Sequence, residues 1–110
     1  MKQWEIRLFQ FSQEGLHPAV LISNDERCSH TGTTHVNALF CSTLRAARPA
    51  KVNEVILNGS DGLDWQSVVK CDLMYLLPKS GFSELKGTVS RERRRAISRR
   101  IVDSFKLTMF

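Results

Sequence analysis

Long apolar runs are absent from this sequence of 110 residues. The longest, Ala19 to Ile22 and Leu73 to Leu77, are far shorter than the roughly 20 residues that a membrane-spanning helix requires. The first residues, Met1 to Glu5, also lack the apolar core of a secretory signal peptide. We therefore expect a protein that is retained in the cytoplasm.

Cysteine is scarce, with three residues at positions 28, 41 and 71. Their number is odd and no two form a Cys-x-x-Cys pair, which argues against a disulfide framework and against a zinc site. His30 and His35 have no partner at metal-ligand spacing, so we predict that both are loop residues. The sequence predicts no metal and no cofactor.

Acidic residues are outnumbered by basic ones, 11 against 16, which gives a formal net charge of +5. The excess is concentrated near the carboxyl end, where six arginines (91, 93, 94, 95, 99 and 100) stand against the single Glu92. Such a segment is either a solvated helix face or a surface that attracts nucleic acid or an acidic protein. Charge alone does not decide between these interpretations.

Most of the chain shows the alternation of apolar and polar residues that is typical of strands. Strands are predicted over residues 4–11, 19–23, 35–42 and 52–57, and residues 67–77 form either one bent strand or two short ones. Residues 24–34 are predicted to be a loop, and a second loop rich in Arg and Ala reaches Pro49. The segment Asn58-Gly59-Ser60-Asp61-Gly62 has the composition of a tight turn.

The last segment has helical periodicity instead. Ser90 is a good N-cap and Glu92 falls in the first turn, where a negative charge is favourable. Apolar residues then recur at helical spacing at positions 97, 101, 102, 105 and 109. The pattern predicts an α+β protein, in which a small, strongly curved antiparallel sheet or barrel is followed by an amphipathic helix. A chain of 110 residues with 42% hydrophobic content can form one compact core, so we predict that residues 1–110 are a single domain.

The segment Lys70-Cys71-Asp72 is the strongest chemical signal. On a strand, Lys70 and Asp72 share one face with attachment points about 6.6 Å apart, whereas Cys71 points the other way and is expected to be buried. A cation and a carboxylate so placed can flank one phosphodiester of RNA, which supplies its own nucleophile in the 2′-hydroxyl and requires no metal. The alternative is an exposed ion pair without function.

Five segments in the same order resemble the MazF/PemK family of bacterial toxins. They are Trp4-Glu5-Ile6, Pro18 to Asp25, Phe40 to Thr43, Gly62 with Ser67 to Asp72, and Lys86 to Ser90. The resemblance implies an SH3-like barrel of the MazF/PemK/CcdB type. It also implies a homodimer with an RNA groove across the subunit interface, and an acidic antitoxin that blocks this groove. The implied activity is a metal-independent endoribonuclease that cleaves single-stranded RNA such as mRNA.

The resemblance also implies roles for individual residues. Asp72 corresponds to the general base, and Lys70 to the acid or phosphate-stabilising cation, where some members have arginine. Since lysine is a point charge, it cannot bind two phosphate oxygens as a guanidinium does. The hydroxyl at the end of the third strand corresponds to Ser42, or to Thr43 if the register slips by one residue.

Three further residues, Glu5, Arg45 and Arg48, are predicted to bind substrate. The clearest departure from the family is His17, which stands before Pro18 where most catalytic members have arginine, after a shortened loop. An imidazole can donate to a phosphate or transfer a proton because it titrates near neutrality. His17 is therefore either a catalytic residue or an ordinary turn residue next to a proline.

Two functions remain open. The first is a ribonuclease toxin that depends on Lys70, Asp72 and Ser42 and also uses His17. The second is a catalytically degenerate relative that binds nucleic acid or a partner protein without cleavage. The Lys-x-Asp pattern supports the first, whereas the missing arginine and the shortened loop support the second.

Overall fold

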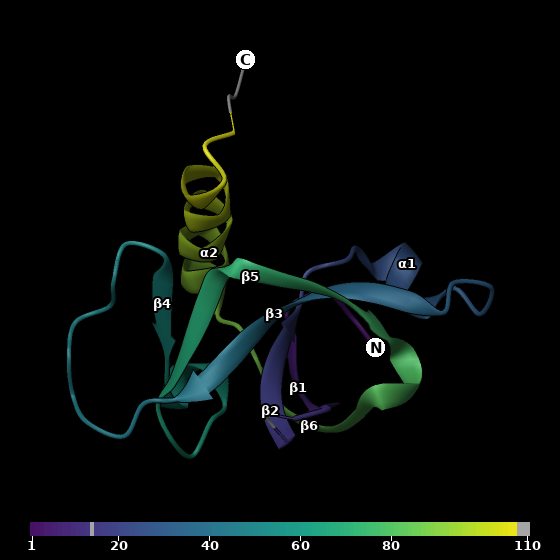
Figure 1. Ribbon diagram of the computed structural model, residues 1–110, viewed down its shortest axis with the longest axis horizontal. Helices are drawn as coiled ribbons and strands as arrows, with labels where there is room; N and C mark the ends of the chain where they lie inside the picture. The colour runs from purple at the N-terminus through teal and green to yellow at the C-terminus, as the bar shows by residue number, and fades with distance from the viewer. Residues whose placement is uncertain (14, 108–110) are drawn as a thin grey trace.

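The computed structural model describes residues 1–13 and 15–107, which form one strongly bent antiparallel sheet with a long helix beside it (Figure 1). The strands are β1 (Glu5–Phe11), β2 (Gly15–Leu21), β3 (His35–Thr43), β4 (Glu54–Leu57), β5 (Ser67–Pro78) and β6 (Phe82–Thr88), in the order β4-β5-β3-β2-β1-β6. The helices are α1 (Asp25–Ser29) and α2 (Arg91–Ser104), with short 3-10 turns η1 (Gly59–Asp61) and η2 (Lys79–Gly81). The predicted α+β class, with a curved sheet and a carboxyl-terminal helix, is confirmed.

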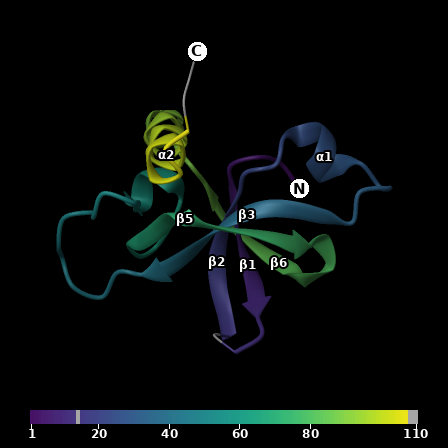
Figure 2. The same ribbon diagram turned by 45° about the horizontal axis from the view of Figure 1, so that its top comes forward.

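Both faces of the sheet carry apolar side chains. One cluster contains Ile6, Val20, Leu39 and Val69 and is covered by Ile97 of α2, so we call this side the α2 face. The other cluster is covered by α1 through Cys28, and we call this side the α1 face; its members include Phe9, Ala19, Ala38 and Leu77. Figure 1 and Figure 2 both place α2 beside β4 and β5, and α1 near the start of β3. The two helices therefore cover different ends of the sheet.

Strand β5 is one bent strand rather than two short ones. Opposite β3, Cys41 pairs with Val69 but Leu39 pairs with Met74, so that four residues of β5 stand against Phe40 alone. This insertion is a bulge, which bends the strand and increases its twist. The bulge contains Lys70 and Asp72, the residues singled out by the sequence.

Several sequence predictions need correction. Residues 24–34 are not all loop, because α1 lies within them and is capped by the side chain of Asn24. Val52 precedes β4 and is 78% exposed instead of belonging to the strand. Strand β6 was not expected, because its sequence is polar and has few buried residues. Phe105 lies just beyond the end of α2 and is 48% exposed, whereas the predicted helical residue Met109 lies outside the described residues.

The start of α2 is held by a buried carboxylate. Ser90 is the N-cap by position, but its side chain makes no capping bond. Instead, the Ser90 N–H donates to the side chain of Asp61 at 2.8 Å, and Arg93 forms an ion pair with the same carboxylate. Asp61 belongs to the predicted turn at 58–62, which folds as η1 with a capping box between Asn58 and Asp61. No helix within residues 1–13 and 15–107 has the length and apolar character needed to cross a membrane.

Candidate active site

His17 and Ser42 lie on the same face of the sheet, although they are far apart in sequence. Ala19 of β2 pairs with Phe40 of β3, and His17 and Ser42 each lie two residues beyond this pair toward the same end. Side chains repeat every second residue along a strand, so both project from the α1 face. The ring of His17 lies 5.0 Å from that of Phe40. Thr43 projects from the opposite face, so Ser42 is the hydroxyl that shares a face with His17.

Lys70 belongs to the same face. Ser42 pairs with Val68 of β5, and Lys70 lies two residues further along that strand. On its other side Lys70 pairs with Glu54, the first residue of β4. The register therefore assembles an imidazole, a hydroxyl and an ammonium on one face from three neighbouring strands.

A buried glutamate holds the ammonium of Lys70. The side chain of Glu54 is fully buried, and it forms ion pairs with Lys70 and with Arg48, whose Nη1 and Nη2 lie 2.7 and 3.1 Å from its two oxygens. The Lys51 N–H donates to the same carboxylate at 2.9 Å. The side chains of Arg48 and Lys70 remain 36% and 24% exposed, whereas that of Glu54 is buried, so the solvent-accessible part of this cluster is cationic. This cluster has a net charge of +1 and suits a phosphate group.

The ionisation of Glu54 follows from these partners. The hydrogen bonds from Arg48 lower its pKa most, burial opposes them, and Lys70 and the Lys51 N–H lower the pKa further. The result is a pKa well below the ordinary range of a glutamate. Glu54 is therefore ionised at every physiological pH.

Asp72 has a different partner. Its Oδ1 accepts a hydrogen bond of 2.9 Å from the side-chain amide of Asn53, and the carbonyl of Asn53 accepts from the Cys71 N–H at 2.8 Å. Asp72 and Lys70 do not form an ion pair with each other, since each is bound by one of two consecutive residues, Asn53 and Glu54. Asp72 is exposed and lines a hollow of about 400 Å³ together with Val52, Asn53, Asp103, Ser104 and Lys106.

The remaining predicted residues lie apart from this group. Glu5 is on β1, which is separated from β5 by β2 and β3. Burial raises the pKa of Glu5, but hydrogen bonds from the Arg7 side chain at 2.8 Å and the Lys2 N–H at 3.0 Å outweigh it, and the pKa is lowered. Arg45 is exposed in the segment after β3. The structure thus brings together His17, Ser42 and Lys70, but not Glu5.

Sequence reasoning missed Asn53 and Glu54. The only available signal was a glutamate at the start of an otherwise apolar strand, where a carboxylate needs a buried cationic partner. Its partners could not be identified without the pairing of β4 with β5. Arg48, expected to bind substrate, is also bound to Glu54 through both terminal nitrogens, which fixes its guanidinium next to Lys70.

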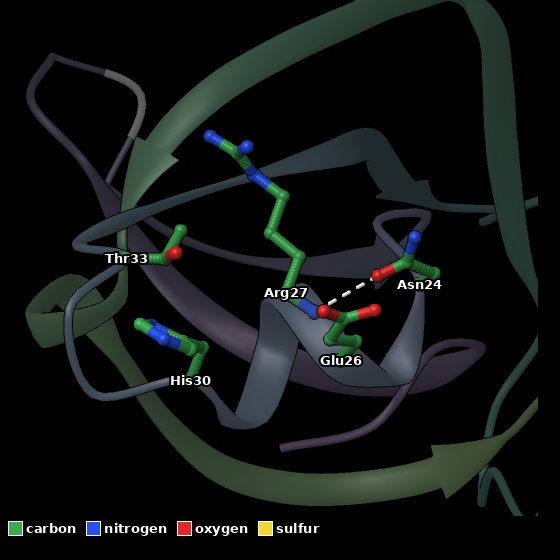
Figure 3. Close-up of a pocket in the computed structure, with 5 residues that line it drawn as sticks. All are labelled: Asn24, Glu26, Arg27, His30 and Thr33. Atoms are coloured by element: carbon green, nitrogen blue, oxygen red, sulfur yellow. Dashed lines mark hydrogen bonds between the residues drawn. The ribbon is translucent and has the colours of Figure 1, made fainter.

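A second pocket lies beside α1 (Figure 3). It is lined by Asn24, Glu26, Arg27, His30 and Thr33. Its side chains brace the segment around them: Asn24 accepts from the Arg27 N–H at 2.8 Å, and His30 Nδ1 accepts from the Gly32 N–H at 3.0 Å. Since its lining includes neither His17 nor Lys70, this pocket is separate from the candidate active site.

Comparison with solved structures shows the same fold in several proteins. An endoribonuclease in complex with its cognate antitoxin, from a mycobacterial species, superposes with a TM-score of 0.82 and 21% identity, covering 100% of this chain and 99% of the other. The toxin MazF-mt6 of Mycobacterium tuberculosis gives 0.80 and 21%, covering 96% and 99%. The MazE-MazF complex of Deinococcus radiodurans gives 0.74 and 17%, covering 98% and 97%. At these identities the likeness establishes the fold alone.

Comparison at the level of sequence establishes the family. No curated protein matches the chain. However, the family model described as "PemK-like, MazF-like toxin of type II toxin-antitoxin system" matches residues 2–105, which is nearly the whole chain. The chain therefore belongs to the PemK-like, MazF-like toxins of type II toxin–antitoxin systems.

Proposed function

We propose that this protein is a metal-independent endoribonuclease that cleaves single-stranded RNA. The observation that supports this proposal most directly is the placement of His17, Ser42 and Lys70 on one sheet face, with Asp72 in the adjoining bulge. Lys70, Asp72 and Ser42 are residues to which the family resemblance gives a catalytic role, whereas His17 stands where most catalytic members have arginine. These four residues come from three strands, and only the sheet register makes them neighbours.

The proposed reaction is an attack of the RNA on its own backbone. Oδ1 of Asp72 is held by Asn53, and its Oδ2 accepts the proton of the 2′-hydroxyl. A bond forms between the 2′-oxygen and phosphorus while the bond from phosphorus to the 5′-oxygen breaks, and His17 donates a proton to that leaving oxygen. Lys70 and Arg48 stabilise the charge on the phosphorane, and Ser42 donates to a phosphate oxygen. The products are a 2′,3′-cyclic phosphate and a 5′-hydroxyl.

The test is cleavage of a long single-stranded RNA by purified protein in excess chelator. Asp72→Asn should abolish cleavage, because an amide cannot accept the proton, whereas the matched variant Asp64→Asn should cleave normally, since Asp64 is an exposed carboxylate outside the site. The released ends should carry cyclic phosphates. Intact RNA at high concentrations of folded wild-type protein would refute the proposal.

The role of His17 has its own signature. If an imidazolium serves in place of the family arginine, cleavage should decline as the pH rises above neutrality, since histidine side chains in general lose their proton in that range. His17→Ala should remove that dependence together with most of the activity. A flat pH response in active protein would refute this role for His17.

We also propose that the functional unit is a homodimer with an acidic antitoxin as its partner. Two of the similar structures are complexes with an antitoxin or with MazE. In this chain β5 exposes Leu73, Tyr75 and Leu76 beyond the end of its pairing with β4. A second copy or the antitoxin would cover these apolar side chains. Light scattering after size exclusion should give twice the chain mass of 12.5 kDa.

One observation favours the non-catalytic alternative. The ring of His17 is packed against Phe40 at 5.0 Å and Phe11 at 6.3 Å, as a structural histidine would be. A dimer that binds RNA but leaves it intact, with an unchanged affinity in His17→Ala, would support a binding protein instead of an enzyme.

A further inference from the structure

The arginine-rich segment of α2 consists of two groups that the sequence does not distinguish. Three of its six arginines are engaged with the rest of the fold: Arg93 pairs with Asp61, Arg94 donates to the carbonyl of Val89, and Arg100 donates to that of Val52. The other three, Arg91, Arg95 and Arg99, are exposed, and none of them forms an ion pair with any residue in 1–13 or 15–107. We call these three residues the arginine ridge.

The ridge forms a regular row of positive charge. Its members are four residues apart, so they recur once per turn at intervals of about 6 Å along the helix. The six arginines of α2 face three carboxylates, Glu92, Asp103 and the Asp61 paired with Arg93, which leaves a charge of +3 on this side of the molecule. A hollow of about 610 Å³ lies along the row, lined by Glu92, Arg95, Ala96, Arg99, Arg100 and Asp103.

The hollow along the arginine ridge adjoins the hollow that contains Asp72. Arg100 lines the hollow of the ridge and donates to the carbonyl of Val52 at 2.9 Å. Val52 and Asp103 in turn line the hollow that contains Asp72. Figure 2 shows α2 running beside β5 at this end of the sheet. A chain bound at Asp72 can therefore continue along α2.

We propose that the arginine ridge binds the phosphodiester backbone of single-stranded RNA next to the scissile bond. This inference rests on the proposed function for the identity of the polyanion. The hollow contains Glu92 and Asp103 as well as arginines. These carboxylates repel the acidic groups of a peptide and the phosphates of RNA alike, but RNA also carries base amino groups, which donate to carboxylates. The described residues that line this hollow include no aromatic ring on which a base could stack, so the arginines contact phosphates, and this part of the binding does not depend on sequence.

The test is the binding of a fluorescent 20-nucleotide oligo(C) RNA to the full chain, measured by anisotropy between 50 and 300 mM salt. Asp72→Asn protein is used throughout, so that the RNA stays intact. The triple variant Arg91→Gln, Arg95→Gln and Arg99→Gln should bind the RNA more weakly. The slope of its log affinity against log salt should be smaller in magnitude by about 2, because each of the three phosphates that is no longer neutralised contributes roughly 0.7. Glutamine is nearly as good a helix former as arginine, so α2 should persist.

A matched control removes the same charge elsewhere. Lys2, Arg27 and Lys79 are changed to glutamine; Arg27 belongs to α1, at the other end of the sheet from α2. This variant should keep the wild-type salt dependence. The proposal is overturned if the arginine-ridge variant shows the same slope of log affinity against log salt as the parent protein. It is also overturned if the variant still binds RNA but no longer binds poly-L-glutamate, because the ridge would then be a site for an acidic protein. Because binding is measured without cleavage, absence of ribonuclease activity would refute the proposed function and leave this result standing.

Discussion

Replacing Glu54 by glutamine should strongly destabilise the protein, because Glu54 is a buried carboxylate with two cationic partners. The substitution keeps the shape of the side chain but removes the charge that binds Arg48, Lys70 and the Lys51 N–H. It leaves two cations facing each other across a neutral amide, one of whose N–H groups points at a donor. The segment from Arg48 to Lys51 and the start of β4 lose their common attachment.

The magnitude follows from the burial of the carboxylate. Removing one partner of a buried ion pair costs about 3–5 kcal/mol. The carboxylate itself is fully buried, but both cations can be hydrated after the change, since their side chains are 36% and 24% exposed. We therefore expect a loss at the lower end, about 3 kcal/mol in the free energy of unfolding. For a domain of this size that corresponds to a midpoint lower by about 12 °C.

The effect should depend on pH in a defined direction. The pKa of Glu54 is lower in the folded state than in the unfolded chain, so its contribution to stability is complete above the ordinary glutamate value of about 4.3. Below that value the difference between wild type and Glu54→Gln should shrink by about 1.4 kcal/mol for each pH unit. The advantage of the wild type is thus present at neutral pH and lost in acid.

The assay is urea unfolding followed by the fluorescence of the two tryptophans, at pH 7 and at pH 3. Glu84→Gln serves as the control, because the Glu84 side chain is 64% exposed in its pair with Lys86 and such pairs contribute at most about 1 kcal/mol. The reasoning is refuted if Glu54→Gln at pH 7 lies within about 1 kcal/mol of the wild type, or if the difference at pH 3 equals that at pH 7.

Three further predictions concern the rest of the fold. Gly87→Ala should lower the free energy of unfolding, measured by thermal unfolding, by about 1–3 kcal/mol, because a Cβ there would lie 2.1 Å from the carbonyl oxygen of Asp61. Gly59→Ala, whose Cβ would have nothing within 4 Å, should lower it by less than about 1 kcal/mol. Equal losses in the two variants would contradict this packing. Asp61→Asn should cost about 2–3 kcal/mol in urea unfolding by weakening the bond to Arg93, and a change within error would show that η1 does not anchor α2. Cys71, whose pKa burial raises to about 12, should resist iodoacetamide at pH 8 until the protein unfolds, and labelling of the native protein by mass spectrometry would contradict its burial.

Local patterns in the sequence were sufficient for most of the elements. Alternating residues predicted β1, β3 and most of β5, and helical spacing predicted α2, because these patterns report directly which side of an element is buried. The turn at 58–62 was recognisable from its Asn, Gly and Asp residues. In contrast, β6 and α1 had no such signal: β6 is a polar strand, and α1 is a five-residue helix stabilised by its Asn24 cap and a single buried cysteine, Cys28.

The sequence by itself therefore indicated the family and the class of fold, since these depend on residue types and their order, and it supplied candidate residues for the proposed chemistry. Only the tertiary structure decided which of those residues meet. The pairing of β2, β3 and β5 placed His17, Ser42 and Lys70 on one face, and that of β4 with β5 gave Lys70 its buried partner. Folding also separated the arginines of α2 into those bound by the fold and those left in solvent. These outcomes depend on contacts between distant segments, whose register no local pattern encodes.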